Sequence, residues 1–294
     1  MNLYPEISVI IPCYNSYNFI EETIQSVFTQ TFDNWEIIIV NDGSTDGTDE
    51  LLKKYVSLEK VTIIDQTNKG VSAARNHGFS ISKGKYVVFL DSDDVLSKNF
   101  LKSRYSFLEE NKNIDFCCGD VYTFYNNIHN VLTKEKGIYN NINYKVLTYR
   151  KNFTTVPSNF MFRKKALIKY NIRFNENLSS TADRFFLLEL SLYLKGGYIE
   201  NSPLFYRIHE KSMSSKLTMK LIKDNELFYK YVDANPIYYR DFKKHYLFYK
   251  NYILGMSYLK KLHPKCLLYL SKLTLNFPSM FLMKIINKIW PNVR

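Results

Sequence analysis

Three carboxylates, Asp91, Asp93 and Asp94, stand within four residues directly after an apolar run. The run before them, residues 86–90, is rich in β-branched and aromatic side chains, which predicts a buried strand of a parallel sheet. Ligands of open α/β sheets bind just beyond the carboxyl ends of such strands. A hard divalent metal, which prefers oxygen ligands and shares them with substrate phosphates, would offset the repulsion among the three acids. The alternative is a solvated acidic turn that caps the next helix.

The segments around this cluster alternate between strand-like and helix-like patterns. This order is typical of βαβ units and a parallel sheet. Residues 114–163 are more strand-like and rich in Asn, Tyr and Thr, which predicts a mixed sheet with loops there. The predicted strands are 7–11 (closed by a proline), 35–40, 61–65 and 85–90, and the predicted helices are 18–29, 48–56, 71–82, 98–109, 185–194, 217–231 and 241–270.

A polar loop follows each of the four predicted strands. Because the carboxyl ends of parallel strands meet at one edge of a sheet, we expect these loops to form a single pocket. In it, Asp42 could accept from a base N–H, Tyr14 could stack, and Arg75 could bind a base edge or a phosphate. Singly, these residues would also suit a helix cap, a core-edge aromatic and a surface ion pair. The loops are residues 12–15, 41–46, 68–76 and 91–94.

Four segments carry a family resemblance. SVIIPCYN (8–15), IIIVNDGSTDGT (37–48), NKGVSAARNHG (68–78) and YVVFLDSDD (86–94) closely resemble the nucleotide-sugar-binding half of the family 2 glycosyltransferases. These are inverting enzymes of the GT-A fold, so the resemblance implies an α/β, Rossmann-like mixed sheet flanked by helices. It covers about residues 6–105 and extends more weakly to about residue 215. No P-loop or Rossmann glycine motif competes with this interpretation.

The resemblance implies a UDP-sugar donor whose base lies in the pocket between the first loops. Asp42 is then expected to recognise the uracil, with Arg75 nearby. Pro12, Tyr14 and Asn15 are expected to line the base pocket.

The fourth loop is expected to hold the rest of the donor. By the same resemblance, Asp91 contacts the ribose, and Asp93 binds the Mn²⁺ or Mg²⁺ that bridges the diphosphate. Ser92 belongs to the same nucleotide-sugar-binding set, and Asp94 is placed against the donor sugar.

An inverting transfer also needs a base to take the proton of the acceptor hydroxyl. The candidate is Asp183, at the start of a predicted helix, which matches the Asp of the Glu-Asp pair typical of the family. Ala182 stands where that pair has its Glu, which leaves a second polar contact in doubt. The alternative for Asp183 is an acid that only stabilises the helix N-terminus.

A second acceptor-side segment, FYRIHEKSMS (205–214), resembles the Tyr-Arg-x-His-x-x-Ser-x-Ser stretch of the family. The resemblance implies that His209 reaches the metal or the diphosphate, because a neutral imidazole can complete a coordination sphere of carboxylate, phosphate and water. Arg207 and Lys211 are further candidates for phosphate contacts.

Charge divides the chain into two very different parts. Residues 1–210 hold 24 Lys/Arg and 24 Asp/Glu, whereas residues 211–294 hold 16 and 4, which accounts for the whole net charge of +12. The basic, aromatic-bearing tail suits an anionic membrane surface. The alternatives are a helical bundle that covers the catalytic domain and a homodimer contact. Nucleic-acid binding is not expected, because no motif accompanies the charge.

The remaining composition indicates a reducing compartment. The four cysteines form no CxxC pair, and Cys117 and Cys118 lie within an apparent strand, where buried thiols are expected. We find neither a signal-peptide pattern nor a spanning apolar segment, so the expected location is cytoplasmic, with the inner face of the cell membrane as a peripheral site.

Together these patterns predict a GT-A catalytic domain over residues 1–215, with a nucleotide-sugar half at 1–110 and an acceptor half at 111–215, followed by a basic helical region at 216–294. The predicted activity is metal-dependent, inverting transfer of a hexose or N-acetylhexosamine from a UDP-sugar to a hydroxyl of a surface-glycan or lipid-linked acceptor, which forms a β-linkage. The surface glycan is expected to be a capsule, an O-antigen or a lipooligosaccharide. The alternatives are a polyprenyl-phosphate sugar transferase and a non-catalytic sugar-nucleotide-binding subunit.

Overall fold

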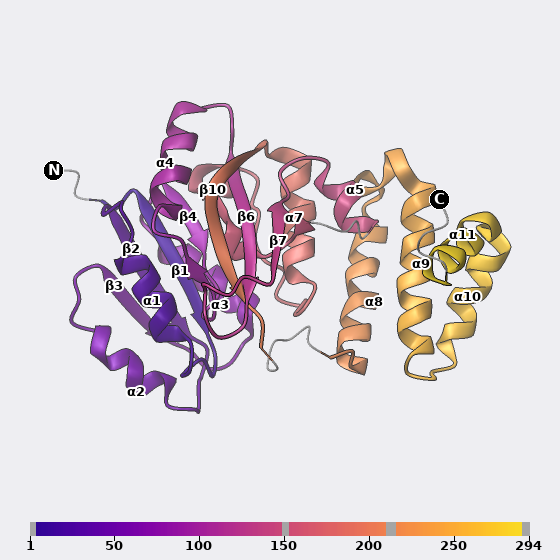
Figure 1. Ribbon diagram of the computed structural model, residues 1–294, viewed down its shortest axis with the longest axis horizontal. Coiled ribbons are helices and arrows are strands. Elements are labelled where there is room, and N and C mark those ends of the chain that lie inside the picture. The colour runs from indigo at the N-terminus through magenta and orange to yellow at the C-terminus, as the bar shows by residue number, and fades with distance from the viewer. Residues whose placement is uncertain (1–3, 149–152, 210–215, 290–294) are drawn as a thin grey trace. The chain divides into compact units, whose positions relative to one another are not determined.

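The computed structural model describes residues 4–148, 153–209 and 216–289, and the chain divides into two units (Figure 1). The first unit comprises the described residues of 1–142 and 151–212 and contains the whole sheet. The second comprises those of 143–150 and 213–294 and is helical. The described residues 143–148, which the sequence patterns assign to the acceptor half, thus belong to the helical unit.

The first unit is built on a mixed sheet. Its first four strands in sheet order are parallel, as the alternating patterns predict, and the later part mixes parallel and antiparallel pairs. The sheet order is β3 (Val61–Asp65), β2 (Trp35–Asn41), β1 (Ile7–Cys13), β4 (Tyr86–Phe89), β9 (Phe160–Arg163), β6 (Phe116–Phe124), β10 (Gly196–Arg207) and β5 (Val95–Leu96), with β7 (Thr133–Gly137) and β8 (Phe153–Thr154) paired beyond β6.

The sequence pattern predicted that the first strand ends before Pro12. In the structure, strand β1 continues through Pro12 to Cys13. The Ile10 carbonyl accepts from the Leu90 amide at 2.9 Å, so this edge of β1 faces β4. Pro12 lies two residues further along the same edge, where β4 has already ended at Phe89. The missing N–H of proline therefore breaks no ladder hydrogen bond there.

Helices cover the sheet because each has one apolar face. Helix α3 packs on β1 and β2, and α4 packs on β6 and β10. Helix α7 begins at Ala182, three residues before its predicted start, so Asp183 lies in its first turn. The helices of this unit are α1 (Ile20–Phe28), α2 (Thr48–Leu52, continued by a 3₁₀ turn at Lys53–Tyr55), α3 (Val71–Ile81), α4 (Phe100–Glu110), α6 (Lys164–Lys169) and α7 (Ala182–Tyr193).

Strand β10 is the main element that the sequence patterns did not indicate. Its centre, Glu-Asn-Ser-Pro at residues 200–203, has the composition of a turn. The structure accommodates these residues as an irregularity, because the register of β10 against β6 shifts between Ile199 and Leu204. Because the bulged centre has the composition of a turn, the sequence pattern did not indicate this strand of 12 residues.

The helical unit contains α8 (Met219–Ala234), α9 (Lys243–Leu259), α10 (Lys265–Asn276) and α11 (Pro278–Ile289), with α5 (Ile142–Leu147) at its edge. The expected helix over 241–270 is in fact two helices, because the chain turns at residues 260–264. Helix α10 begins directly after Pro264. In the described part of the chain no single helix is long and apolar enough to cross a membrane. The pair Lys265–Asn276 and Pro278–Ile285 passes that test together but bends by 112°.

Gly78 sets how closely α3 approaches the sheet. A Cβ atom at this position would lie 2.5 Å from Ile10 Cγ2 and 3.3 Å from Val40 Cγ2. We expect Gly78→Ala to lower the free energy of unfolding by about 1–3 kcal/mol through overpacking, although alanine is the better helix former.

Urea denaturation followed by circular dichroism measures this effect. Ser80→Ala on the same helix is the matched control, because Ser80 is exposed and its hydroxyl donates only to the His77 carbonyl. Equal stability of the Gly78→Ala variant and this control would contradict the close approach of α3 to β1.

Candidate functional site

The four polar loops lie at the carboxyl ends of β1, β2, β3 and β4, which are adjacent and parallel in the sheet. The structure therefore brings them to one edge, as the strand pattern predicted. Contacts between the loops confirm their proximity. The Ser16 hydroxyl lies 2.7 Å from the Ser92 hydroxyl, and the Thr45 amide donates to Asn15 Oδ1 at 2.8 Å.

Asp42 organises the loop between β3 and α3. Its Oδ1 accepts from the Lys69 amide and from Gln66 Nε2, and its Oδ2 accepts from the Gly70 amide, each at 2.8 Å. Gln66 in turn contacts the His77 ring at 2.8 Å. These contacts use three of the about four lone-pair directions of the carboxylate, and Asp42 is buried, with 2% of its surface exposed.

Arg75, on α3, joins the two carboxylates that the resemblance assigns to opposite sides of the reaction. Its Nη2 donates to Asp91 Oδ1 at 2.6 Å, and its Nη1 donates to Asp183 Oδ1 at 2.7 Å. The guanidinium is buried, with 3% of the side chain exposed, and its planar fork of donors suits this two-sided contact.

An aromatic cluster holds these three side chains together. The Arg75 guanidinium lies 4.7 Å from the centre of the Phe174 ring, which stacks on Phe186 at 4.1 Å. Phe186 is on α7 one turn after Asp183, and Phe89, at the end of β4, packs edge-on against both rings. Packing of β4 against α7 thus sets the distance that Arg75 spans.

Helix α3 is also tied directly to the segment before α7. Asn76 Nδ2 donates to the Phe174 carbonyl at 2.9 Å, and the Phe174 amide donates back to Asn76 Oδ1 at 3.1 Å. The Ser72 hydroxyl donates to the Leu178 carbonyl at 3.3 Å. The motif around Arg75 therefore positions the acceptor-side chain as well as the donor-side loop.

Burial shifts the protonation of the acids in this site. Burial raises the pKa of Asp183 to about 6; Arg75 opposes the rise and the nearby Asp91 adds to it. Burial also raises the pKa of Asp91, against the effect of Arg75 and with that of Asp93. Burial lowers the pKa of Arg75, but the two carboxylates outweigh it and raise that pKa overall. With 30% of its side chain exposed, Asp183 stays accessible and is mostly ionised at neutral pH.

Asp93 and His209 form a second pair beside this cluster. His209 Nε2 lies 2.8 Å from Asp93 Oδ2, the ring packs on Phe19 at 4.7 Å, and its buried Nδ1 has no partner in the described chain. Neighbouring ligands on an octahedral Mg²⁺ with bonds of about 2.1 Å lie about 3 Å apart. The pair is therefore spaced as two adjacent ligands of such a metal would be, and phosphate and water would have to supply the others. No group of three or more such side chains suited to a metal occurs in the part of the chain that the structure describes.

Arg207 and Asp94 lie beneath the site and support it. Arg207 is buried, where its Nη2 donates to Glu22 Oε2 at 2.5 Å and its Nε donates to the Asp93 carbonyl at 2.9 Å. Asp94 is fully buried and accepts from the Arg207 amide at 3.3 Å. Burial, with repulsion from Asp93 and Asp91, raises the pKa of Asp94 well above its usual range. The protein thus occupies the Arg207 side chain and buries Asp94, whose Oδ2 has no hydrogen-bond partner in the described chain. A phosphate contact by Arg207 and a donor-sugar contact by Asp94 therefore stay predictions that burial disfavours.

The base-pocket residues differ in accessibility. Tyr14 has 51% of its surface exposed, as a stacking platform requires, whereas Pro12 is buried within β1. Asn15 has a left-handed φ of 52°, a conformation that asparagine tolerates, and this turn brings its amide to the Ser44 hydroxyl. Lys211, the other predicted phosphate contact, lies outside the described residues.

Sequence reasoning missed several residues that hold this site. Gln66 follows β3 directly, and its place at a strand end was a usable signal. Glu22 gave none, because an acid in the first turn of α1 has an ordinary role at a helix N-terminus. Its partner Arg207 is 185 residues away.

Comparisons with known proteins identify the family of this chain. Residues 8–170, more than half of the chain, match the family described as "Glycosyl transferase family 2". The chain therefore belongs to glycosyltransferase family 2, and the predicted family is confirmed.

Relatives of known name include GlyA, a glycosyltransferase of Streptococcus pneumoniae, which is 39% identical over 40% of this chain. GgaB, a minor teichoic acid biosynthesis protein of Bacillus subtilis, is 31% identical over 74% of the chain. YibD, an uncharacterized glycosyltransferase of Escherichia coli, is 30% identical over 73%. The matches span 17%, 25% and 64% of these relatives, less than two thirds of each.

Solved structures confirm the GT-A fold. TarS of S. aureus, residues 1–349 in complex with UDP-GlcNAc, superposes with a TM-score of 0.63 at 21% identity, over 86% of this chain and 72% of that one. A mannosyltransferase from Pyrobaculum calidifontis in complex with GDP-Man and Mn²⁺ gives a TM-score of 0.59 at 16% identity, over 97% and 80%. Identities this low establish the fold alone.

Removing the Arg75 charge should change the titration of Asp183. In Arg75→Met we expect the pKa of Asp183 to rise above about 6, because burial and Asp91 then act on it without the opposing cation. Carboxyl ¹³C NMR across a pH series, with Asp183→Asn to assign the resonance, measures this shift. Arg75→Lys keeps the charge and should give a smaller rise, whereas an unchanged pKa in Arg75→Met would contradict the pairing.

Proposed function

We propose that this protein transfers a sugar from a UDP-sugar to a hydroxyl of a surface-glycan acceptor, with inversion at the anomeric carbon and formation of a β-linkage. The observation that carries the proposal is the Arg75 bridge between Asp91 and Asp183. It unites a donor-side acid at the end of β4 with an acid at the start of α7 that is suited to act as the base. The UDP complexes of TarS support the choice of nucleotide.

In the proposed reaction, Asp183 takes the proton of the acceptor hydroxyl while that oxygen bonds to the anomeric carbon. The bond from this carbon to the diphosphate breaks on the opposite face, and UDP leaves with the electron pair. A base is most effective when its pKa lies near the working pH. The raised pKa of Asp183, about 6, places this carboxylate in that range and keeps it ionised at pH 7.

The donor is proposed to lie along the loops at the edge of the sheet. Tyr14 stacks on the uracil, Asp42 accepts from its N–H, and Asp91 accepts from a ribose hydroxyl. Asp93 and His209 would hold Mn²⁺ or Mg²⁺, with phosphate and water as the remaining ligands. When bound, such an ion offsets the charge that develops on the departing diphosphate.

The acceptor class is proposed from the relatives. GgaB is named for minor teichoic acid biosynthesis, and another relative, TuaG of Bacillus subtilis, is named for a putative role in teichuronic acid biosynthesis. A polymer or lipid-linked intermediate of the cell envelope is therefore the acceptor that we propose. We place the reaction in the cytoplasm, at the inner face of the membrane, where such intermediates would meet a nucleotide sugar.

Asp183→Asn should separate binding from chemistry. We expect kcat to fall by about 10²–10⁴-fold, the usual contribution of a general base, with little change in UDP affinity. Release of UDP from a panel of UDP-sugars identifies the donor, and isothermal titration calorimetry measures binding. In the wild type, the rate should fall as the pH drops through about 6, because Asp183 becomes protonated. Substantial turnover by the Asp183→Asn variant would reject this assignment of the base.

Asp93→Asn should remove the effect of metal on nucleotide binding. Titration of UDP with and without Mn²⁺ is expected to show tighter binding with the metal in the wild type. The variant should lose that difference and keep the metal-free affinity. Asp49→Asn, an exposed acid on α2, is the matched control and should behave as the wild type. Persistence of the metal effect in Asp93→Asn would refute the proposed ligand.

A further inference from the structure

Helix α10 and the turn before it expose a row of leucines. The exposed fractions are 89% for Leu262, 71% for Leu267, 52% for Leu268 and 79% for Leu275. Exposed apolar residues that occur singly are ordinary, but several within one short segment mark an interaction surface.

These leucines do not serve the packing of the helical unit. The buried face of α10 is formed by Cys266 and Leu273 and packs against α9. With 3.6 residues per turn, Leu268 and Leu275 fall on the opposite face, where Leu268 also lines a groove against α9, and Leu267 lies on a flank, about 100° from Cys266. Helix α10 is therefore apolar on two sides, of which the structure buries only one.

The turn that leads into α10 holds Leu262, the most exposed of the four leucines, in an unusual backbone conformation. Leu262 has a φ of 50°, a left-handed conformation that leucine rarely adopts, and it follows Lys260 and Lys261. The Leu262 amide donates to the Leu259 carbonyl at 2.9 Å and the His263 amide to the Tyr258 carbonyl at 3.0 Å, which closes the turn. A leucine side chain is thus held at the tip of a turn beside two lysines.

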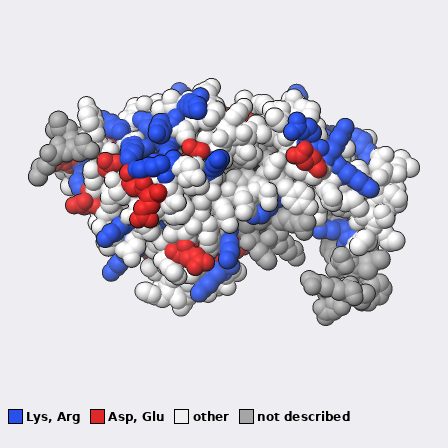
Figure 2. Space-filling model, turned by 90° about the horizontal axis from the view of Figure 1, so that it is seen from above, with Lys and Arg blue, Asp and Glu red and all other residues white. Residues whose placement is uncertain are grey.

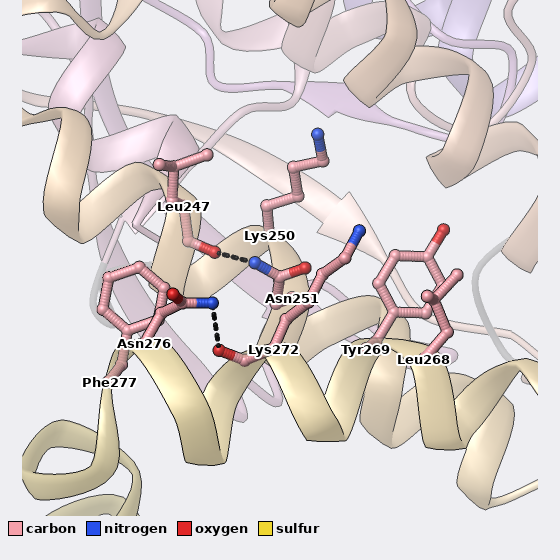
Figure 3. Close-up of a pocket in the computed structure, with 8 residues that line it drawn as sticks. All are labelled: Leu247, Lys250, Asn251, Leu268, Tyr269, Lys272, Asn276 and Phe277. Carbon is pink, nitrogen blue, oxygen red and sulfur yellow. Dashed lines mark hydrogen bonds between the residues drawn. The ribbon is translucent and has the colours of Figure 1, made fainter.

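The chain segment that carries the leucines holds charge of one sign, although Lys265 of α10 pairs with Glu226 of α8 at 3.1 Å. No Asp or Glu occurs from residue 242 to residue 294. A groove of about 440 Å³ lies between α9 and α10, and Figure 3 shows Lys250 and Lys272 extending from these two helices to the same side of it. Lys250 pairs with Asp233, whereas no ion pair of Lys272 is found in the described chain. Figure 2 likewise shows basic side chains spread over the visible face of the helical unit, with few acidic ones.

We propose that residues 260–276 form a membrane-docking surface that lies in the plane of an anionic bilayer. Leu262, Leu267, Leu268 and Leu275 enter the boundary between head groups and acyl chains, as in interfacial amphipathic helices. Lys260, Lys261 and Lys272 contact lipid phosphates, and the groove beside Lys272 accommodates a head group.

The charge and the side-chain types favour a membrane over two other occupants. A symmetric contact with a second copy of the chain would bring the same lysines against one another, and residues 242–294 hold no acid to pair them. Single-stranded nucleic acid would need exposed aromatic faces for stacking, and this row is made of leucine. An anionic bilayer satisfies both the leucines and the lysines.

Vesicle co-sedimentation of the full chain tests the proposal directly and needs no sugar donor, so its outcome is independent of the proposed transfer reaction. Vesicles of phosphatidylcholine alone are compared with vesicles of equal parts phosphatidylcholine and phosphatidylglycerol. We expect binding only to the second kind, with partitioning that weakens as salt is added.

Two pairs of substitutions divide the apolar and the charged contributions. Leu267→Gln with Leu275→Gln should lower partitioning at least tenfold, because both side chains lose their apolar burial. Lys260→Gln with Lys261→Gln should lower it about fivefold for each lysine removed. The matched controls lie in the first unit. Leu132→Gln replaces an exposed leucine, and Lys53→Gln with Lys54→Gln replaces two adjacent exposed lysines. Both control variants should bind vesicles as the wild type does.

Circular dichroism verifies that each variant is folded, as we expect because the substituted positions are exposed. Equal binding to both kinds of vesicle, or unchanged binding by the leucine variant, would overturn the proposal. Sedimentation velocity distinguishes a membrane from a second copy of the chain. The surface would belong to a second copy if the wild type dimerises without lipid and the leucine variant is monomeric but still binds vesicles.

Discussion

The site depends on a single buried guanidinium that two carboxylates share. Arg75 lies between Asp91 and Asp183, and without it two acids would face each other in a largely dehydrated space. Removing one partner of a buried ion pair typically costs about 3–5 kcal/mol, because the remaining charge loses its compensation. The same contact sets the orientation of both acids. It also limits the rise of the Asp183 pKa to about 6, within the range of a useful base.

The rest of the first unit keeps that guanidinium in place. Helix α3 approaches the sheet closely at Gly78, and Asn76 fastens it to the segment before α7. The rings of Phe89, Phe174 and Phe186 fix β4 against α7. A shift of any of these elements would alter the geometry around Arg75, so the fold and the chemistry depend on the same packing contacts.

The two units divide the work by charge. The described sheet unit has buried acids balanced by Arg75 and Arg207, and the first 210 residues have no net charge. The helical region holds the entire excess of basic residues, together with leucines that its own core does not use. A neutral unit suits selective recognition of a nucleotide sugar, and a basic, apolar-faced unit suits attachment to an anionic surface. We interpret the chain as these two physical tasks joined in sequence.

The sequence by itself determined the first four strands, the polar loops after them and the identity of the chemical groups at their ends. These features depend on short-range patterns, because an apolar run followed by a polar loop needs only neighbouring residues to be recognised. The tertiary structure alone decided that Arg75 meets Asp183, 108 residues away, that Arg207 pairs with Glu22, and that Asp94 is buried. Strand β10 was also invisible, because its irregular centre resembles a turn. Such contacts arise when distant elements pack together, and no local pattern encodes which distant partner an ionic side chain will find.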